Sequence, residues 1–246
     1  MAKKLIQILL LMLVLACDKV ENPLPTVYGD FNWELYPNDP TTYPYDIANP
    51  SNNWTLNTNE KGILLEDYTG HKCTNCPAAA TIATQLEDDT ALGVIVVSVH
   101  ASTDGSFQST DEVEFTVDYQ TDAGDAYVQE MPGFIGNPMG TINRNDGGYS
   151  NTNWYFSSNW ATGVNDEISQ GNLDANIQLQ YNYYPSTNGL FIHTETTFLN
   201  TLSGNYHLIV YLIRNDVISP QKMNDGTIDH HYHCLLYTSP SPRDWT

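Results

Sequence analysis

Two cysteines separated by two residues, Cys73 and Cys76, are the side chains with the most distinctive chemistry in this 246-residue sequence. When such a pair lies between a strand and a helix, unpaired N–H groups and the helix dipole stabilise a thiolate on the first sulfur. The second sulfur then lies close enough to attack a mixed disulfide formed on the first. The spacing therefore predicts thiol–disulfide exchange, with Cys73 as the attacking thiolate and Cys76 as the resolving thiol.

Charged residues near the pair suggest how protons would be handled. Glu66 belongs to the apolar segment before the cysteines, and we expect it to take or hold a proton for Cys76. Lys72 adds positive charge beside Cys73, which favours the thiolate.

Two other uses of the cysteine pair stay open. One is a structural or vestigial disulfide in a protein that only binds. The other is a metal site, but zinc takes four ligands and the sequence has no second Cys-x-x-Cys. We therefore expect no metal and no cofactor.

The segments around the pair have the pattern of a strand, a helix and a second strand. Residues 63–68 form a short apolar run typical of a buried strand, and residues 93–99 form another that is rich in β-branched side chains. Between them, Pro77 suits the first turn of a helix. The apolar face of that helix has the i, i+3, i+4, i+7 spacing at Ala79, Ile82, Ala83 and Leu86. Residues 136–144 lead into a further strand, and Gly171 ends a helix that contains Trp160 and Val164.

Beyond residue 172 the apolar period changes from helical spacing to two. Residues 173–183 alternate, Asn188-Gly189 is a strong hairpin turn, and 190–198 form the returning strand. A third strand is expected over 206–214. Three strands in series predict an antiparallel β-sandwich over 172–233.

Residues 62–77 and 136–144 resemble the thioredoxin superfamily, in which the proline before the later strand is cis and faces the dithiol. The resemblance makes Pro138 that proline and gives it the role of docking the substrate backbone. The sequence departs from the superfamily by having no tryptophan before Cys73 and Thr-Asn between the cysteines.

More narrowly, residues 65–77, 204–208, 219–221 and 230–233 resemble the Omp-twenty-eight-related outer membrane lipoproteins. This resemblance implies an α/β thioredoxin-like domain, here 59–171, followed by an antiparallel β-sandwich, here incomplete. It also implies an outer-membrane or surface location, but no particular reaction.

The first residues indicate export. Lys3 and Lys4 precede an apolar run over 5–15, which is the pattern of a signal peptide and is too short for a membrane span. Residues 14–17 resemble a lipobox, so we expect cleavage after residue 16 and acylation of Cys17. The alternative is an ordinary secretory signal that contains a cysteine.

The predicted lipid anchor would bind the outer membrane durably. Residues 17–58 carry the lipidated cysteine and a Pro- and Asn-rich stretch that we interpret as a tether.

Residues 234–246 look foreign to the protein. From Cys234 to Asp244 the sequence matches, codon for codon, the translation of a transposase-type sequencing adapter, so we exclude it from the fold. We expect the natural chain to continue past His233. With Cys17 acylated and Cys234 excluded, Cys73 and Cys76 are left as one pair in an oxidising compartment.

The charge balance excludes one class of partner. Nine basic residues stand against 29 acidic ones, a net charge of −20, which repels nucleic acid. The partners we expect are the membrane, through the anchor, and either thiols of exported proteins or surface ligands. In the second case the protein would be a non-catalytic adhesion or binding protein, with contact area from the aromatic stretches 149–160 and 181–184. Exposure of Cys73 would favour exchange, and burial of both sulfurs would favour binding.

Overall fold

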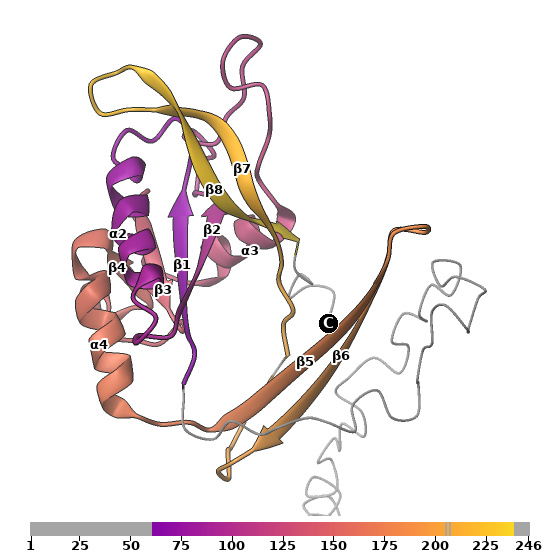
Figure 1. The fold of residues 1–246 in the computed structure, drawn as a ribbon. Helices are drawn as coiled ribbons and strands as arrows, with labels where there is room; N and C mark the ends of the chain where they lie inside the picture. Colours follow the sequence, from indigo (N-terminus) through magenta and orange to yellow (C-terminus); the bar gives the residue numbers. More distant parts are fainter. Residues whose placement is uncertain (1–60, 205, 207, 239–246) are drawn as a thin grey trace, which may run out of the picture.

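The protein is a mixed α/β molecule, and the computed structural model describes residues 61–238 except 205 and 207. Its centre is a six-stranded sheet in the order β4–β3–β1–β2–β8–β7 (Figure 1). The strands are β1 (Ile63–Thr69), β2 (Val94–His100), β3 (Met139–Ile142), β4 (Trp154–Phe156), β7 (Leu212–Lys222) and β8 (Ile228–Thr238). The helices are α2 (Cys76–Asp88), α3 (Asp122–Glu130) and α4 (Trp160–Gln170), with short 3-10 turns at Tyr149–Asn151 and Ser157–Asn159.

Strands β1 and β2 are parallel and are joined by α2. The order of strand, helix and strand is the one that the sequence predicts. β3 runs antiparallel to β1 and pairs Met139 with Tyr68, and β4 runs antiparallel to β3. The expected helix before Gly171 is confirmed as α4, which ends at that glycine in the left-handed conformation (φ 61°). Glycine adopts this conformation without steric cost.

Two apolar cores cover the two faces of the sheet. Side chains of α2 and α4 pack on one face together with Ile63 and Leu65 of β1. Side chains of α3 pack on the other face together with Tyr68. Because successive strand residues point to opposite faces, the neighbours Glu66 and Asp67 enter different environments.

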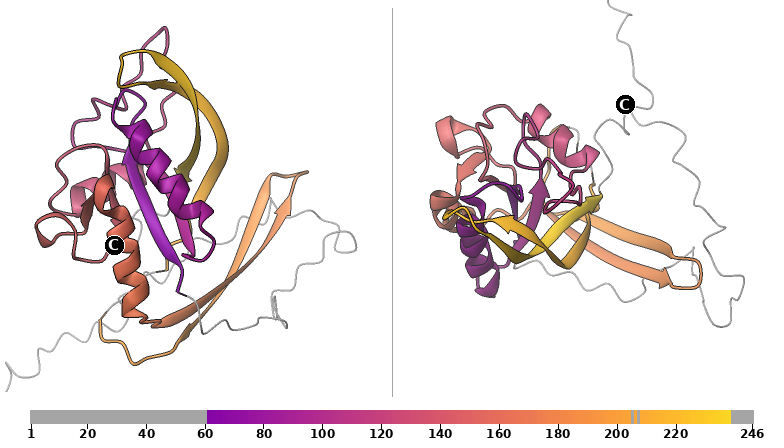
Figure 2. Two further views of the ribbon diagram at one scale, coloured as in Figure 1. Left: turned by 60° about the vertical axis from the view of Figure 1, so that its left-hand side comes forward. Right: turned by 90° about the horizontal axis from the view of Figure 1, so that it is seen from above.

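Strands β5 (Ala175–Tyr184) and β6 (Gly189–Phe198) form a separate two-stranded sheet. The pairing runs in register from Ala175–Phe198 to Tyr184–Gly189, so the hairpin predicted around Asn188-Gly189 is confirmed. Figure 2 shows this ribbon projecting away from the helices and the larger sheet.

The prediction of a strand over 206–214 is wrong in its position. Strand β7 begins at Leu212 and pairs with β8 in a second hairpin, which joins the main sheet where Ser98 of β2 pairs in parallel with Leu235. The expected three strands in series are therefore two hairpins in two sheets. An alternating sequence gives the face of each residue, but the partner strand is chosen by distant pairing.

Strand β8 continues to Thr238 and so includes residues 234–238, which we expect to come from an adapter. The remainder of that tail, Cys17 and the tether lie outside the described residues. Among the residues that are described, no helix combines the length and apolar character needed to cross a membrane.

Candidate functional site

The two cysteines form a disulfide at the N-terminus of α2, where the sequence places them. The Sγ–Sγ distance is 2.07 Å, and α2 begins at Cys76 with Pro77 in its first turn. The side chain of Asn75 makes no capping hydrogen bond, and the first turn of α2 carries no acidic residue. The helix N-terminus is therefore free to favour negative charge on sulfur.

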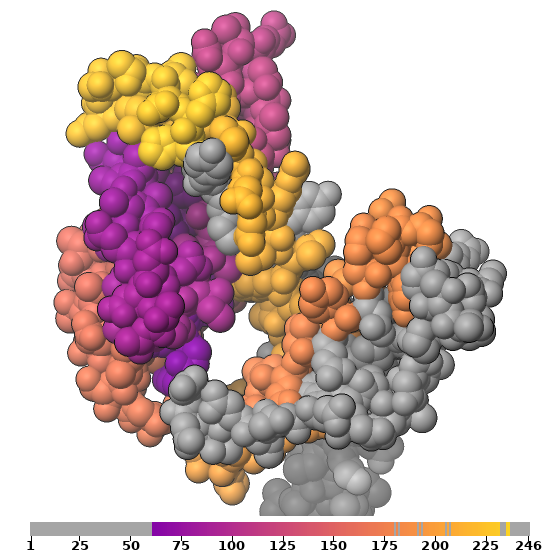
Figure 3. Space-filling view, viewed as in Figure 1, coloured from indigo at the N-terminus to yellow at the C-terminus, as the bar shows by residue number. Residues whose placement is uncertain are grey.

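Both cysteines are buried, each with 1% of its surface exposed. Part of the covering comes from the β7–β8 hairpin. Gln221 Nε2 donates to the carbonyl oxygens of Cys73 (3.0 Å) and Gly70 (3.4 Å), and the backbone N–H of Lys222 donates to His71 O (2.8 Å). In Figure 3 the yellow hairpin lies against the top of the violet part of the chain, which contains β1 and α2.

The loop over 102–120 covers the turn before the cysteines from another side. The N–H of Lys72 donates to Phe107 O (3.0 Å), and Gln108 Nε2 donates to Thr69 O (2.6 Å). A Cβ on Gly70 would come within 2.7 Å of Phe107 O. Glycine at position 70 is thus what allows the two backbones to approach.

His71 and Lys72 interact with this loop through their side chains. His71 is buried, its Nε2 lies 2.9 Å from Ser109 O, and its ring stacks on Phe115. Loss of hydration on burial lowers the pKa of His71. Lys72 Nζ lies 3.3 Å from a carboxylate oxygen of Asp111, so the positive charge expected beside Cys73 is shared with an acidic partner.

Glu66 is held on the α3 face of the sheet, away from α2. Its carboxylate accepts hydrogen bonds from Arg144 Nε and Nη2 (2.7 Å each), from the Tyr211 hydroxyl (2.8 Å) and from Thr141 (2.6 Å). The Arg144 guanidinium also lies over the Tyr127 ring at 3.8 Å. The predicted role of Glu66 as a proton relay for Cys76 is therefore wrong, because its carboxylate is held by Arg144, Tyr211 and Thr141 on the other face of the sheet.

The charges in this cluster stabilise one another. Burial alone would lower the pKa of Arg144, but the hydrogen bonds and charge of Glu66 outweigh it and raise that pKa. Burial and the charge of Glu66 raise the pKa of Tyr211, which remains a neutral donor. The cluster fixes Tyr211, in the segment that leads into β7, against the main sheet.

Asp67, and not the expected Glu66, is the carboxyl group that faces the cysteines. It lines a cavity of about 10 Å³ together with Cys76, Ser98 and His231. The side chain is buried, its Oδ1 has no hydrogen-bond partner among the described residues, and burial raises its pKa to about 7. The strand period was the available signal, since Asp67 shares a face with Leu65, which packs on α2.

Pro138 follows a cis peptide bond from Asn137, as the superfamily resemblance implies. The pairing of Met139 with Tyr68 places Pro138 at the end of β1 from which the chain continues to the cysteines. Asn137 is fixed at the same place, because its Oδ1 accepts from Gln108 Nε2 (3.1 Å). The structure thus gathers Cys73, Cys76 and Pro138 at one end of the sheet.

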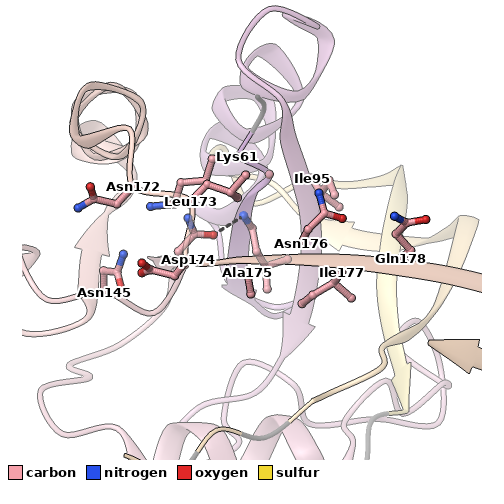
Figure 4. Close-up of a pocket in the computed structure, with 13 residues that line it drawn as sticks. Lys61, Ile95, Asn145, Asn172, Leu173, Asp174, Ala175, Asn176, Ile177 and Gln178 are labelled. Atoms are coloured by element: carbon pink, nitrogen blue, oxygen red, sulfur yellow. Dashed lines mark hydrogen bonds between the residues drawn. The ribbon is translucent and has the colours of Figure 1, made fainter. Parts of the chain in front are cut away.

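A larger cleft of about 710 Å³ lies where β5 leaves α4 (Figure 4). Its lining is rich in amide side chains, but two of these and Lys61 already have a hydrogen-bond partner. Asn143, Asn145 and Lys61 all donate to the carboxylate of Glu167, at 3.2, 2.7 and 2.7 Å. The cleft shares no lining residue with the cavity beside Cys76.

Comparisons with known proteins give little guidance. No protein-family model matches the sequence, and no curated protein matches it significantly. One solved structure is similar, the crystal structure of a structural-genomics target from Agrobacterium tumefaciens. It is 12% identical, with a TM-score of 0.41 over 73% of this chain and 72% of the other. A likeness this distant carries no argument about function.

Proposed function

We propose that this protein is an exported lipoprotein, anchored in the outer membrane through acylated Cys17, whose thioredoxin-like domain exchanges disulfides with thiols of exported proteins. The observation that carries the proposal is the cavity that Cys76 shares with Asp67, a buried carboxyl group whose Oδ1 has no hydrogen-bond partner in the described structure. A disulfide that serves only as a staple has no use for such a group. A resolving thiol needs a proton donor and acceptor.

The order of elements supports a thioredoxin-like domain. A Cys-x-x-Cys pair stands between β1 and α2, a parallel strand follows, and a cis proline precedes the later strand β3. These are the features that the superfamily resemblance implies. Pro138 would dock the backbone of the substrate beside Cys73.

The exchange proceeds in two attacks on sulfur. A substrate thiolate attacks Sγ of Cys73, the Cys73–Cys76 bond breaks, and the electron pair leaves on Sγ of Cys76. A second substrate thiolate then attacks the substrate sulfur of the mixed disulfide and releases the Cys73 thiolate. The substrate dithiol has lost two electrons to the cysteine pair, and the reverse sequence passes them to a substrate disulfide.

Asp67 supplies and recovers the proton in this scheme. With a pKa of about 7 it is present in both protonation states at neutral pH. The Cys76 thiolate takes its proton when the disulfide opens, and the Asp67 carboxylate takes it back when Cys76 attacks. The cavity has room for about one water molecule, which would carry the proton between them.

A second function is favoured by the burial of both cysteines. On this alternative the disulfide is a staple in a surface binding protein, and exposed aromatic side chains supply contact area. Tyr149, Phe156, Tyr181 and Tyr183 are exposed and meet that requirement, whereas Trp154 and Trp160 belong to the core.

The reduction potential of the Cys73–Cys76 pair separates the two functions. The full chain would be equilibrated with glutathione buffers, and differential alkylation would be measured peptide by peptide so that Cys17 and Cys234 are counted separately. A potential between about −270 and −120 mV is expected for a working oxidoreductase. A pair that stays oxidised below about −300 mV would be a staple, and the exchange proposal would fall.

A further inference from the structure

The β7–β8 hairpin covers the proposed reaction site. We call its residues 217–222 and 228–233 the cover, because Gln221 and Lys222 in this part of the hairpin donate hydrogen bonds to the turn that carries the cysteines. A thiolate has to reach Sγ of Cys73 along the line of the Cys73–Cys76 bond. With Cys73 1% exposed, no protein thiol can do so in this conformation.

The underside of the cover is polar where it meets the turn. Along β7, Ser219 and Gln221 are buried, whereas Ile218, which precedes them on the other face of the strand, is 54% exposed. Opposite them on β8, His231 pairs with Ser219 and lines the cavity beside Cys76. Contacts of this kind bury little apolar area, so separating them costs far less than opening an apolar core.

A break in the strand pairing marks where the cover could bend. The register between β7 and β8 shifts between Arg214 and Val217, and Asp216 has a positive φ of 56°. A bulge interrupts the ladder and bends the strand locally. The cover lies beyond this bulge, and all its residues precede Cys234, so none comes from the expected adapter segment.

We infer that the cover is a gate, held closed by Gln221 and hinged at the bulge near Asp216, that must lift before a substrate thiol can reach Cys73. The inference rests on the proposed exchange function and assigns its regulation. The closed gate protects the disulfide from small reductants and from unselected thiols. A partner that displaces Gln221 from the carbonyl oxygens of Gly70 and Cys73 opens the site.

The first test is the rate at which dithiothreitol reduces the Cys73–Cys76 disulfide in the folded chain. In wild type we expect a rate that does not change with low concentrations of urea, because the gate opens without global unfolding. Gln221→Ala should accelerate reduction about tenfold, the factor for losing about one net hydrogen bond of the closed state. The matched control Ile218→Thr lies on the outer face of the same strand and should change the rate less than twofold.

The second test needs no variant. Amide hydrogen exchange of wild-type peptides covering 217–222 should report opening of the gate at the hydrogen bond from Lys222 N to His71 O. We expect this exchange to be faster than that of β1 and, like the wild-type rate of disulfide reduction, to be insensitive to low urea.

A gate is overturned if Gln221→Ala leaves the reduction rate unchanged, or if reduction and exchange both follow global unfolding in urea. The equilibrium potential of the disulfide tests the exchange function separately, because a gate changes the rate in both directions and leaves the potential alone. Suppose that Gln221→Ala accelerates reduction but the disulfide has a potential below about −300 mV. The exchange function would then be refuted, and the gate would stand.

Discussion

At the scale of single residues, Glu66 and Asp67 show how one step along a strand separates two chemistries. Both carboxyl groups are buried, but Glu66 has the Arg144 guanidinium and two hydroxyl donors, whereas Oδ1 of Asp67 has no partner in the described structure. Desolvation therefore falls uncompensated on Asp67, whose pKa rises to about 7. Replacing each carboxyl group by an amide is therefore expected to change the stability of the protein in opposite directions at the two positions.

Asp67→Asn should stabilise the protein in a pH-dependent way. Between about pH 4 and 7 the unfolded chain ionises at position 67 while the folded chain keeps its proton, so wild type loses stability as pH rises. Asparagine cannot ionise, and the variant should gain on the order of 2–4 kcal/mol at pH 8 and almost nothing at pH 4. Urea unfolding of the oxidised protein at pH 4, 6 and 8 measures this. A gain that is equal at all three values would contradict the assignment.

Glu66→Gln should do the reverse. Removing the charge leaves Arg144 partly buried without its anionic partner, so we expect a loss of about 2–4 kcal/mol in the free energy of unfolding at pH 7. The pH profile of disulfide reduction by dithiothreitol should stay that of wild type, whereas Asp67→Asn should lose the inflection near pH 7. If Glu66→Gln also removed the inflection, Glu66 rather than Asp67 would be the proton relay.

At the scale of elements, the cysteine turn is held by segments that are distant in the sequence. Phe107 O in the loop over 102–120 accepts a hydrogen bond from the N–H of Lys72. The N–H of Lys222 in β7 donates one to His71 O. Gly70 lies where the loop approaches most closely. The turn is therefore positioned by backbone contacts that leave little room for change.

Gly70→Ala should disturb this contact. The added Cβ would lie 2.7 Å from Phe107 O, a backbone atom that cannot rotate away, so we expect a loss of about 1–3 kcal/mol. Gly62→Ala is the matched control, because nothing lies within 4 Å of a Cβ at that position. Thermal unfolding of the two oxidised variants measures the difference. Equal stabilities would mean that the loop can move aside at no cost.

At the scale of the whole molecule, the main sheet combines strands from both ends of the described chain, whereas the ribbon of β5 and β6 stands apart. These two strands pack chiefly on each other. The exposed apolar side chains on β5 are Ile177, Leu179, Tyr181 and Tyr183. A two-stranded ribbon has marginal stability by itself.

Hydrogen exchange across the full chain should therefore show three levels of protection. We expect β1 and β2 to exchange only with global unfolding, the cover at an intermediate level, and the β5–β6 ribbon fastest. Peptide-level mass spectrometry on the native protein gives all three at once. If the ribbon were protected as strongly as β1, it would be a fixed part of the core.

The sequence by itself determined the features that depend on neighbouring residues. Cys73 and Cys76 before a proline-started helix, the apolar runs of β1 and β2, and the turn at Asn188-Gly189 all follow from local spacing and local backbone preference. They are found correctly because each is decided within a few residues.

Only the tertiary structure decided which carboxyl group faces the disulfide, where the last two strands pair, and what covers the cysteines. Glu66 and Asp67 are equally polar in sequence, and their difference comes from which core packs on each face of β1. The cover depends on the pairing of β7 with β8 and on Gln221 reaching a turn 148 residues earlier. Such contacts between distant segments leave no periodic signal in the sequence, because the residue pattern of each segment does not depend on which other segment it contacts.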